Sequence, residues 1–348
     1  MSEPRRGFAS DNYAGPHPEI LAAVAGVGAD HAPAYGDDEV TARLSDLVRA
    51  EFGPAARVFP VFNGTGGNVV VLAALCRQWG AVICAETAHV HVDEGGAPET
   101  IAGLKLWTVP TLDGKLTPAL IDKQAWGFDD VHRARPAAVT ITQSTELGTV
   151  YTPAEIAALA DHAHARGMRL HVDGARLANA AASLGVSLAD ITSRVGVDAV
   201  TFGGTKNGAL GAEAVVVFDP ELSEAVRRLR KTFGQLPSKM RFVSAQLEAL
   251  LTDDLWRRTA AHANAMAARL EAAVCQVPGV RIARAVQANA VFAVLSPAVT
   301  ARLRTRHRFY TWNQTTGEVR WMCAWDTRPE DIDAFAADVA REAAADPG

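Results

Sequence analysis

The hydrophobic pattern of the first part of the chain alternates between two periods. Short apolar runs are separated by longer segments in which apolar residues recur at helical spacing. These runs lie at residues 57–62, 81–85, 104–109, 137–142, 169–172 and 199–202. Strands that alternate with helices predict an α/β fold in which a mostly parallel sheet lies between two layers of helices.

The helical segments differ in how clearly their ends are marked. Apolar spacing predicts helices over residues 18–25 and 39–52, and a third helix that follows a glycine-rich turn at 63–68 and runs through residue 75. The clearest helix covers 153–166, because Thr152 suits the N-cap and Pro153 suits the first helical position.

Near residue 240 the pattern changes. A long Ala-rich helical region runs to about Val274, and three strands follow at 280–283, 290–295 and 319–323, with a last helix after Pro329. This order predicts a smaller α+β domain. We therefore expect an N-terminal arm and large domain over residues 1–245 and a small C-terminal domain over residues 246–348.

Composition narrows the class of protein. Among 348 residues, 49% are hydrophobic and 21% are charged, which is typical of a soluble globular protein. The net charge is -5, and no basic stripe suggests a nucleic-acid partner. The chain has no run of eighteen apolar residues to span a membrane, and its first residues lack the apolar stretch of a secretory signal. Four scattered cysteines in apolar settings favour reduced thiols in a cytoplasmic protein.

One lysine stands out because lysine is rare in this chain, with six against twenty-eight arginines. Lys206 follows an apolar run and two glycines in the segment Thr-Phe-Gly-Gly-Thr-Lys-Asn-Gly. A strand end in an α/β sheet is where ligands bind, and a lysine attacks an aldehyde once burial or nearby charge removes its proton. An incidental lysine on a surface turn is the alternative. We favour a functional lysine.

A carboxylate follows another buried strand. Asp173 ends the run Leu-His-Val-Asp, and Arg176 comes three residues later. Burying a carboxylate costs free energy unless it meets a cation, and a protonated pyridinium nitrogen is one such cation. Asp173 could instead cap the helix that follows. Together with Lys206 on a neighbouring strand end, the cofactor interpretation is the stronger one.

The turn Asn-Gly-Thr-Gly-Gly-Asn at 63–68 lies between a strand and a helix. Free backbone N–H groups and the positive end of the helix dipole make such a turn a phosphate site, with Gly64 and Thr65 as the expected binders. The turn lacks the spacing of a dinucleotide fingerprint and the lysine of a P-loop.

A cluster of His, Asp and Glu side chains occupies residues 86–94. Imidazole can stack on a heteroaromatic ring and can act as a base near neutral pH, so His89 is a candidate for both roles. A metal site is the weaker alternative, because His89 and His91 are only two residues apart and no His-x-x-x-His pair accompanies them. For His91 we expect a structural role.

These motifs together resemble the threonine aldolase branch of the aromatic amino acid β-eliminating lyase/threonine aldolase family. The resemblance covers nearly the whole chain in the expected order. It rests on the segments at 8–15, 34–38, 64–68, 89–94, 173–176, 204–206, 238–241 and 318–326.

The resemblance implies an aspartate-aminotransferase-like fold (fold type I) with pyridoxal 5'-phosphate as the cofactor. Lys206, next to Thr205, would bond covalently to the cofactor aldehyde. Asp173 would pair with the pyridine nitrogen, and His89 would stack over the ring.

The resemblance also implies a substrate clamp and a partner. Ser10, Arg176 and Arg320 would bind the substrate carboxylate, a task that suits the arginine fork. Tyr35 would border the site. Arg241 would reach the cofactor phosphate of a neighbouring subunit, since the family forms homo-oligomers with shared active sites; we expect a homotetramer rather than a dimer.

One segment departs from the family pattern. Where better-known threonine aldolases have Glu-Asn-Thr-His-Asn-Gly, this chain has Gln-Ser-Thr-Glu-Leu-Gly at 143–148. Glu146 therefore stands where a histidine contacts the substrate hydroxyl. We expect Glu146 to orient or deprotonate that hydroxyl, with His89 as the competing base; a bracing role for Glu146 is the alternative.

The expected activity is the cleavage of β-hydroxy-α-amino acids, such as L-threonine, L-allo-threonine or phenylserine, to glycine and an aldehyde. The alternatives are another fold-type-I reaction (β-elimination, racemisation or transamination), a non-catalytic relative, or a metal-dependent aldolase. The sequence leaves the preferred aldehyde, the threo or erythro preference and the physiological substrate open.

Overall fold

A computed structural model describes residues 6–346. Its larger sheet has seven strands in the order β1-β7-β6-β5-β4-β2-β3. All neighbouring strands from β3 to β6 pair in parallel, whereas β7 is antiparallel to both β6 and β1. The strands are β1 (Arg57–Val61), β2 (Gly80–Ala85), β3 (Lys105–Val109), β4 (Arg135–Thr142), β5 (Arg169–Gly174), β6 (Ala199–Gly203) and β7 (Glu213–Val217).

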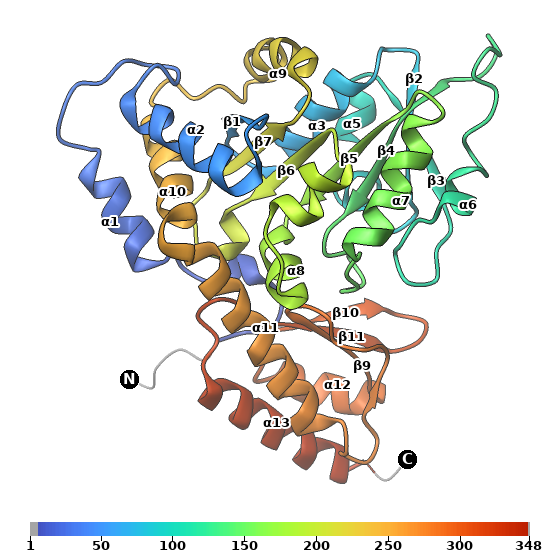
Figure 1. The fold of residues 1–348 in the computed structure, drawn as a ribbon. Helices are drawn as coiled ribbons and strands as arrows, with labels where there is room; N and C mark the ends of the chain where they lie inside the picture. Colours follow the sequence, from blue (N-terminus) through green and yellow to red (C-terminus); the bar gives the residue numbers. More distant parts are fainter. Residues whose placement is uncertain (1–5, 347–348) are drawn as a thin grey trace.

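Helices cover both faces of this sheet (Figure 1). One face packs against α2, α7, α8 and α10, and the other against α3 and α9. The helices of this part of the chain are α1 (Pro18–Gly26), α2 (Glu39–Phe52), α3 (Gly64–Leu75), α4 (His89–Val92), α5 (Ala97–Thr100), α6 (Pro118–Ile121), α7 (Pro153–His164), α8 (Leu177–Leu184), α9 (Pro220–Thr232) and α10 (Arg241–Leu251).

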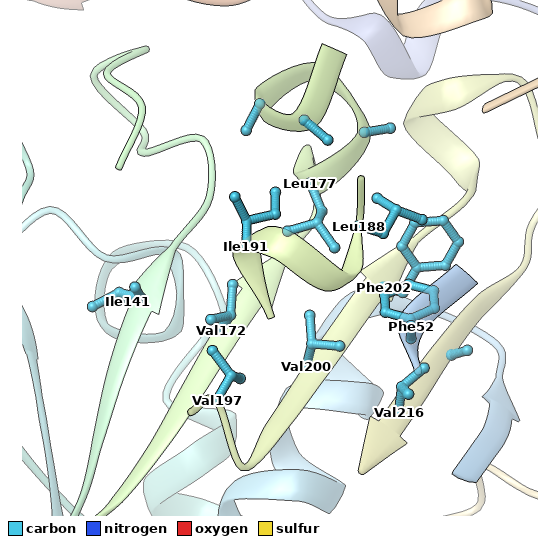
Figure 2. Close-up of a cluster of buried hydrophobic side chains, with 14 of the residues drawn as sticks. Phe52, Ile141, Val172, Leu177, Leu188, Ile191, Val197, Val200, Phe202 and Val216 are labelled. Carbon is cyan, nitrogen blue, oxygen red and sulfur yellow. The ribbon is translucent and has the colours of Figure 1, made fainter. Parts of the chain in front are cut away.

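The core follows from the two-residue period of the strands, which sends alternate side chains to opposite faces. Val172, Val200 and Val216 lie on one face, where they contact the same buried cluster as Phe52 and Phe202 (Figure 2). Their neighbours in sequence, such as Val215 and Val217, face α3 and α9. The predicted α/β class with a mostly parallel sheet is thereby confirmed.

The C-terminal part of the chain forms a second, antiparallel sheet in the order β10-β11-β9-β8. Long helices lie against one side of it (Figure 1), and a separate apolar cluster around Trp321 and Phe335 fills the space between. Its elements are α11 (Leu255–Val274), β8 (Arg281–Ile282), β9 (Ala290–Val294), α12 (Pro297–Arg304), β10 (Tyr310–Asn313), β11 (Glu318–Met322) and α13 (Pro329–Ala344).

The N-terminal arm connects the two sheets. The N–H of Phe8 donates to the carbonyl of Arg308 (2.8 Å), and the N–H of Met322 donates to the carbonyl of Phe8 (2.8 Å). The Phe8 ring stacks on Phe335 with the ring centroids 4.5 Å apart. The arm then continues into the one-turn helix η1 (Asp11–Tyr13). Asp11 of this helix accepts a hydrogen bond from Arg176, which follows β5 at the carboxyl edge of the large sheet.

Several elements differ from the sequence prediction. Strand β7 and the elements α12 and β10 were not predicted. The long helix expected up to Val274 is two helices, because Asp253 and Asp254 have φ values of 50° and 55°, which no α-helix allows. The predicted glycine-rich turn is itself the first turn of α3, which begins at Gly64.

The boundary expected after residue 245 falls inside α10, which packs on α1 and α2 of the large domain. It stays a prediction. Within the described part of the chain, no helix is both long and apolar enough to cross a bilayer.

Candidate active site

A cavity of about 300 Å³ lies at the carboxyl ends of β4, β5 and β6 and at the N-terminus of α3. This edge of a parallel sheet is where α/β folds bind ligands. The cavity brings together eight of the predicted site residues, which come from five segments of the chain. They are Gly64, Thr65, His89, Glu146, Asp173, Arg176, Thr205 and Lys206.

Asp173 is one of the buried acids of the cavity, with only 4% of its surface exposed. Its Oδ1 accepts a hydrogen bond from the N–H of Ala175 (3.0 Å), and its Oδ2 accepts one from the Asn68 amide (2.8 Å). A buried carboxylate needs partners of this kind. The position can hold a cationic ring nitrogen, as the sequence predicted; the assignment itself stays a prediction.

Lys206 lies in the one-turn helix η4 (Thr205–Asn207), directly after β6. Two contacts hold this turn in place: the Glu213 carboxylate accepts from the N–H groups of Gly204 (3.1 Å) and Thr205 (3.4 Å), and the Asn207 amide donates to Trp256 (2.9 Å). Burial raises the pKa of Glu213, against the opposing effect of Lys206. Within residues 6–346, no hydrogen bond or ion pair engages the Lys206 Nζ, so the amine is available to a ligand.

The start of α3 lies where the sequence predicts an anion site, and that role stays a prediction. Asn63 is its N-cap, and its Oδ1 accepts from the N–H of Gly66 (2.7 Å). The N–H groups of Gly64 and Thr65 belong to the first helical turn, where backbone donors have no partner inside the helix. A Cβ on Gly67 would lie 2.7 Å from Thr201 Cγ2, so glycine is needed for this close approach of α3 to β6.

His89 begins the short helix α4, and its Nδ1 lies 2.9 Å from Glu94 Oε1. The hydrogen bond to Glu94 raises the pKa of His89, and the charge of Asp173 adds to this effect against burial and Lys206. Glu94 Oε1 also accepts from the Asn68 amide (2.8 Å). Asn68 thus joins Asp173 to the Glu94–His89 pair.

Glu146 is half-buried in the cavity wall, and its Oε1 accepts from the backbone N–H of His89 (2.8 Å). Burial raises the pKa of Glu146 to about 7, although hydrogen bonds from the backbone oppose the shift. A carboxyl group with such a pKa exchanges its proton near neutral pH, which suits a general base. The predicted role at the substrate hydroxyl and the alternative bracing role both stay predictions.

Arg176 forms a two-pronged ion pair with Asp11: its Nε lies 2.7 Å and its Nη2 2.9 Å from the two carboxylate oxygens. Burial opposes the charged form of Arg176, but the Asp11 carboxylate outweighs it and raises the arginine's pKa. Burial alone would raise the pKa of Asp11, but the Arg176 guanidinium has the larger combined effect and lowers it. Arg176 therefore reaches the cavity as a cation that Asp11 holds in place.

Arg320 lies on β11, close enough to Arg176 for their charges to interact. Burial, with the Arg176 charge in second place, lowers the pKa of Arg320 to about 10. Its Nη2 donates to the carbonyl of Ala9 (3.3 Å), while its buried Nε has no partner among the described residues. An anion between the two arginines would relieve both the repulsion and the missing hydrogen bond.

Four predicted site residues do not line this cavity: Arg320, Ser10, Tyr35 and Arg241. Ser10 caps η1, and its Oγ accepts from the N–H of Asn12 (3.2 Å). Tyr35 lines a different cavity, of about 900 Å³, where Lys231 Nζ lies 5.2 Å from the centre of its ring. Arg241 donates to the carbonyls of Val27 (3.0 Å) and Asp30 (3.4 Å). Their predicted roles are not tested by a single chain.

The cavity also contains polar residues that the sequence did not single out. Asn63, Asn68, Glu94 and Glu213 line it, and Asp11 supports it from the arm. Asn68 could have been found as an amide in the apolar first turns of a predicted helix, and Glu94 as a member of the predicted His/Asp/Glu cluster. Their partners are distant in sequence, so their roles could not be read from spacing.

Comparisons with known proteins agree with this architecture. The family model for "Beta-eliminating lyase" matches residues 7–297. A low specificity L-threonine aldolase from Pseudomonas aeruginosa is 47% identical over 341 residues, which are 97% of this chain and 98% of the relative. The solved threonine aldolase of Leishmania major has a TM-score of 0.91 and 32% identity, with 96% of this chain and 98% of that chain covered. An aspartate aminotransferase from Thermus thermophilus, at 16% identity and a TM-score of 0.70 with 96% and 90% covered, shares the fold alone.

Proposed function

This chain belongs to the beta-eliminating lyase family, and from that premise we propose that it is a threonine aldolase. The reaction is cleavage of the Cα–Cβ bond of L-threonine and related β-hydroxy-α-amino acids to glycine and an aldehyde. The observation that carries the proposal is that Lys206 and Asp173 line one buried cavity at the carboxyl ends of parallel strands. L-threonine aldolases that are 47% and 45% identical over nearly the whole chain favour this reaction over the other reactions known for the fold.

The residues of the cavity fit pyridoxal 5'-phosphate. Lys206 offers an amine that has no partner among the described residues. Asp173 offers a buried carboxylate, and Gly64 and Thr65 offer backbone N–H groups of the first helical turn for a phosphate. When bound, this cofactor supplies an electron sink that accepts the electron pair of the broken Cα–Cβ bond. We assign Lys206 as its covalent attachment point, Asp173 as the partner of its ring nitrogen and His89 as the side chain that stacks on it. Thr205, next to Lys206, completes the set.

The remaining side chains divide the work of the reaction. Arg176 and Arg320 bind the substrate carboxylate, with Ser10 at the margin of this clamp, and so fix the orientation of the Cα–Cβ bond. Glu146 accepts the proton of the β-hydroxyl, whose oxygen becomes the aldehyde carbonyl as the Cα–Cβ bond breaks. A proton then returns to Cα and gives glycine. His89 is the alternative base.

The attachment point is tested by replacing Lys206 with alanine. We expect Lys206→Ala to lose the visible absorption band of the lysine-bound cofactor and nearly all aldehyde release from L-threonine. Lys123→Ala, an exposed lysine on a distant turn, is the matched control and keeps both. A Lys206→Ala protein with undiminished activity would refute the assignment.

The products separate this reaction from its alternatives. Glycine and acetaldehyde from L-threonine, or glycine and benzaldehyde from phenylserine, indicate the aldol cleavage. Pyruvate or another keto acid indicates β-elimination or transamination, and loss of optical activity without cleavage indicates racemisation. Comparison of L-threonine with L-allo-threonine and phenylserine ranks the substrates.

We also propose that the chain forms a homotetramer with shared active sites. The support is that Tyr35 and Arg241 lie outside the cavity of their own chain, where a neighbouring subunit could receive them. Sedimentation analysis should give four times the 36.9 kDa chain mass. An active monomer would rule out the shared site.

Because Cys76, Cys84 and Cys323 are buried free thiols, we place the enzyme in a reducing compartment, the cytoplasm.

A further inference from the structure

We propose that Asn68 and Glu94 are positioning residues that join Asp173 to His89 in one buried, hydrogen-bonded bridge. The bridge fixes the orientation of the His89 ring and determines which ring nitrogen is left for the ligand. Its significance for catalysis rests on the proposed function of His89 and Asp173. Its existence and its effect on His89 can be tested without that function.

The geometry of the bridge accounts for both hydrogens of the Asn68 amide. One N–H donates to Asp173 Oδ2 and the other to Glu94 Oε1, each over 2.8 Å. Both acceptors are carboxylate oxygens, so the amide nitrogen and not its oxygen must face them. The orientation of this side chain is thereby determined by its two partners.

The bridge also solves an electrostatic problem. Asp173 and Glu94 are two acids in one cavity wall, and the Glu94 side chain is only 1% exposed. Two carboxylates buried close together repel each other, and each needs hydrogen-bond donors. Asn68 places one neutral double donor between them. A leucine of similar size could fill the space but could not do this.

At the other end of the bridge, Glu94 determines the state of the His89 ring. Glu94 Oε1 already accepts from the Asn68 amide, so we assign the hydrogen that it shares with His89 Nδ1 over 2.9 Å to the ring nitrogen. Nε2 is then the nitrogen left for the ligand. Carboxylates orient ligating histidines in metal sites by the same contact.

Four charged groups surround His89 from the elements packed against it. Glu94 contacts the ring, Asp173 and Lys206 act on it across the cavity, and Glu146 accepts from its backbone N–H. The acids favour the protonated ring and Lys206 opposes it. Of these four charged groups, Glu94 is the one that hydrogen-bonds to the ring, so its replacement should change the pKa and tautomer of His89 more than replacement of the other three.

The test is an NMR titration of the histidine ring nitrogens in the full-length protein, with and without pyridoxal phosphate, in which His89→Gln identifies the His89 signals. In the native chain we expect neutral His89 to carry its hydrogen on Nδ1. In Glu94→Gln the pKa of His89 should fall toward its ordinary value. In Asn68→Ala the Nδ1–H form should give way to a mixture of the two tautomers. Glu99→Gln, an exposed glutamate five residues away, should change neither.

A second readout is the affinity for the cofactor. Loss of an oriented outer partner weakens ligand binding by about tenfold or more, so we expect Asn68→Ala to raise the dissociation constant of pyridoxal phosphate by that factor. Asn68→Asp should be worse than Asn68→Ala, because it replaces the shared donor by a third carboxylate.

The outcomes separate the bridge from the proposed function. If neither Glu94→Gln nor Asn68→Ala alters the tautomer or the pKa of His89, the bridge is wrong, whatever the enzyme does. If these values change as expected while the native chain cleaves no amino acid, the bridge stands and the aldolase assignment fails. Unfolding of a variant is detected by circular dichroism, and Glu94→Gln, which preserves size and shape, then carries the test.

Discussion

One carboxyl group, Glu146, should make the stability of this chain depend on pH near neutrality. Its pKa lies at about 7 instead of the ordinary 4.5, because burial disfavours the charged form. Between these two values the folded chain keeps a proton that the unfolded chain has released. The free energy of unfolding must therefore fall as the pH rises through this window.

We predict that Glu146→Gln removes this dependence. Glutamine carries no charge at any pH, so the variant should gain on the order of 1–3 kcal/mol relative to the native chain at pH 8 and little at pH 4. Urea unfolding at the two pH values measures the difference, with Glu99→Gln as the exposed control. The variant should also lose activity by about 10²- to 10⁴-fold if Glu146 is the base. Parallel pH curves for the native chain and Glu146→Gln would contradict the prediction.

The sequence predicted the candidate site residues that follow the ends of strands. It missed the residues whose side chains hydrogen-bond to them. Lys206 and Asp173 were found because an unusual charge follows an apolar run. Asn68 was missed because its role is to donate hydrogen bonds to Glu94 and Asp173, which lie 26 and 105 residues away in the sequence. Contacts over such separations are created by the fold, and no local pattern contains them.

Among the elements, α7 shows most directly how local sequence determines structure. Its N-terminus is a complete capping box: the Thr152 side chain accepts from the N–H of Glu155, and the Glu155 carboxylate accepts from the N–H of Thr152. Both contacts satisfy backbone donors that the helix itself leaves open.

We predict that Thr152→Ala lowers the free energy of unfolding by about 1 kcal/mol, the usual contribution of a threonine cap. Activity should remain, because α7 lies outside the cavity. Urea midpoints measure the loss, and Thr315→Ala, in an exposed turn, is the control that should change nothing. An equal loss in both variants would mean that the cap contributes nothing specific.

The elements that were not predicted share a physical cause. Strand β7 follows η4 after only a short connection, so the chain reverses and β7 pairs antiparallel to β6 without the crossover helix that marks a parallel strand. α11 is separated from α10 by two aspartates in left-handed conformations, a choice that depends on the packing around them. A hydrophobic period predicts a helix or strand where apolar residues recur regularly. The chain reversal before β7 and the break between α10 and α11 leave no such regular pattern.

For the whole molecule, the N-terminal arm is the segment on which both parts depend. Phe8 is buried in the core of the small domain, and three residues later Asp11 holds Arg176 of the large domain. Asn289, next to β9, also donates to Asp11 (3.1 Å). The arm therefore places the two arginines of the proposed carboxylate clamp relative to each other.

We predict that Phe8→Ala has consequences beyond the small domain. Truncating a buried phenylalanine costs about 3–5 kcal/mol of folding free energy. In addition, the KM for L-threonine should rise by a larger factor than kcat falls, because the clamp loses its alignment while the cavity around Lys206 is intact. Calorimetry and steady-state kinetics measure the two effects. A stability loss with unchanged KM would show that the arm does not align the clamp.

The pairing of β1 with β7 has a consequence for synthesis on the ribosome. Among residues 6–346, β1 pairs with one strand only, β7, whose residues are made about 150 positions later. Phe8 must wait longer still, since its backbone partners are Arg308 and Met322. The first segments to leave the ribosome are thus among the last to find their partners. For most of translation, the nascent chain exposes the unpaired strand β1 and the aromatic side chain of Phe8. Such segments are what chaperones recognise, so this chain should depend on them more than its stability alone would suggest.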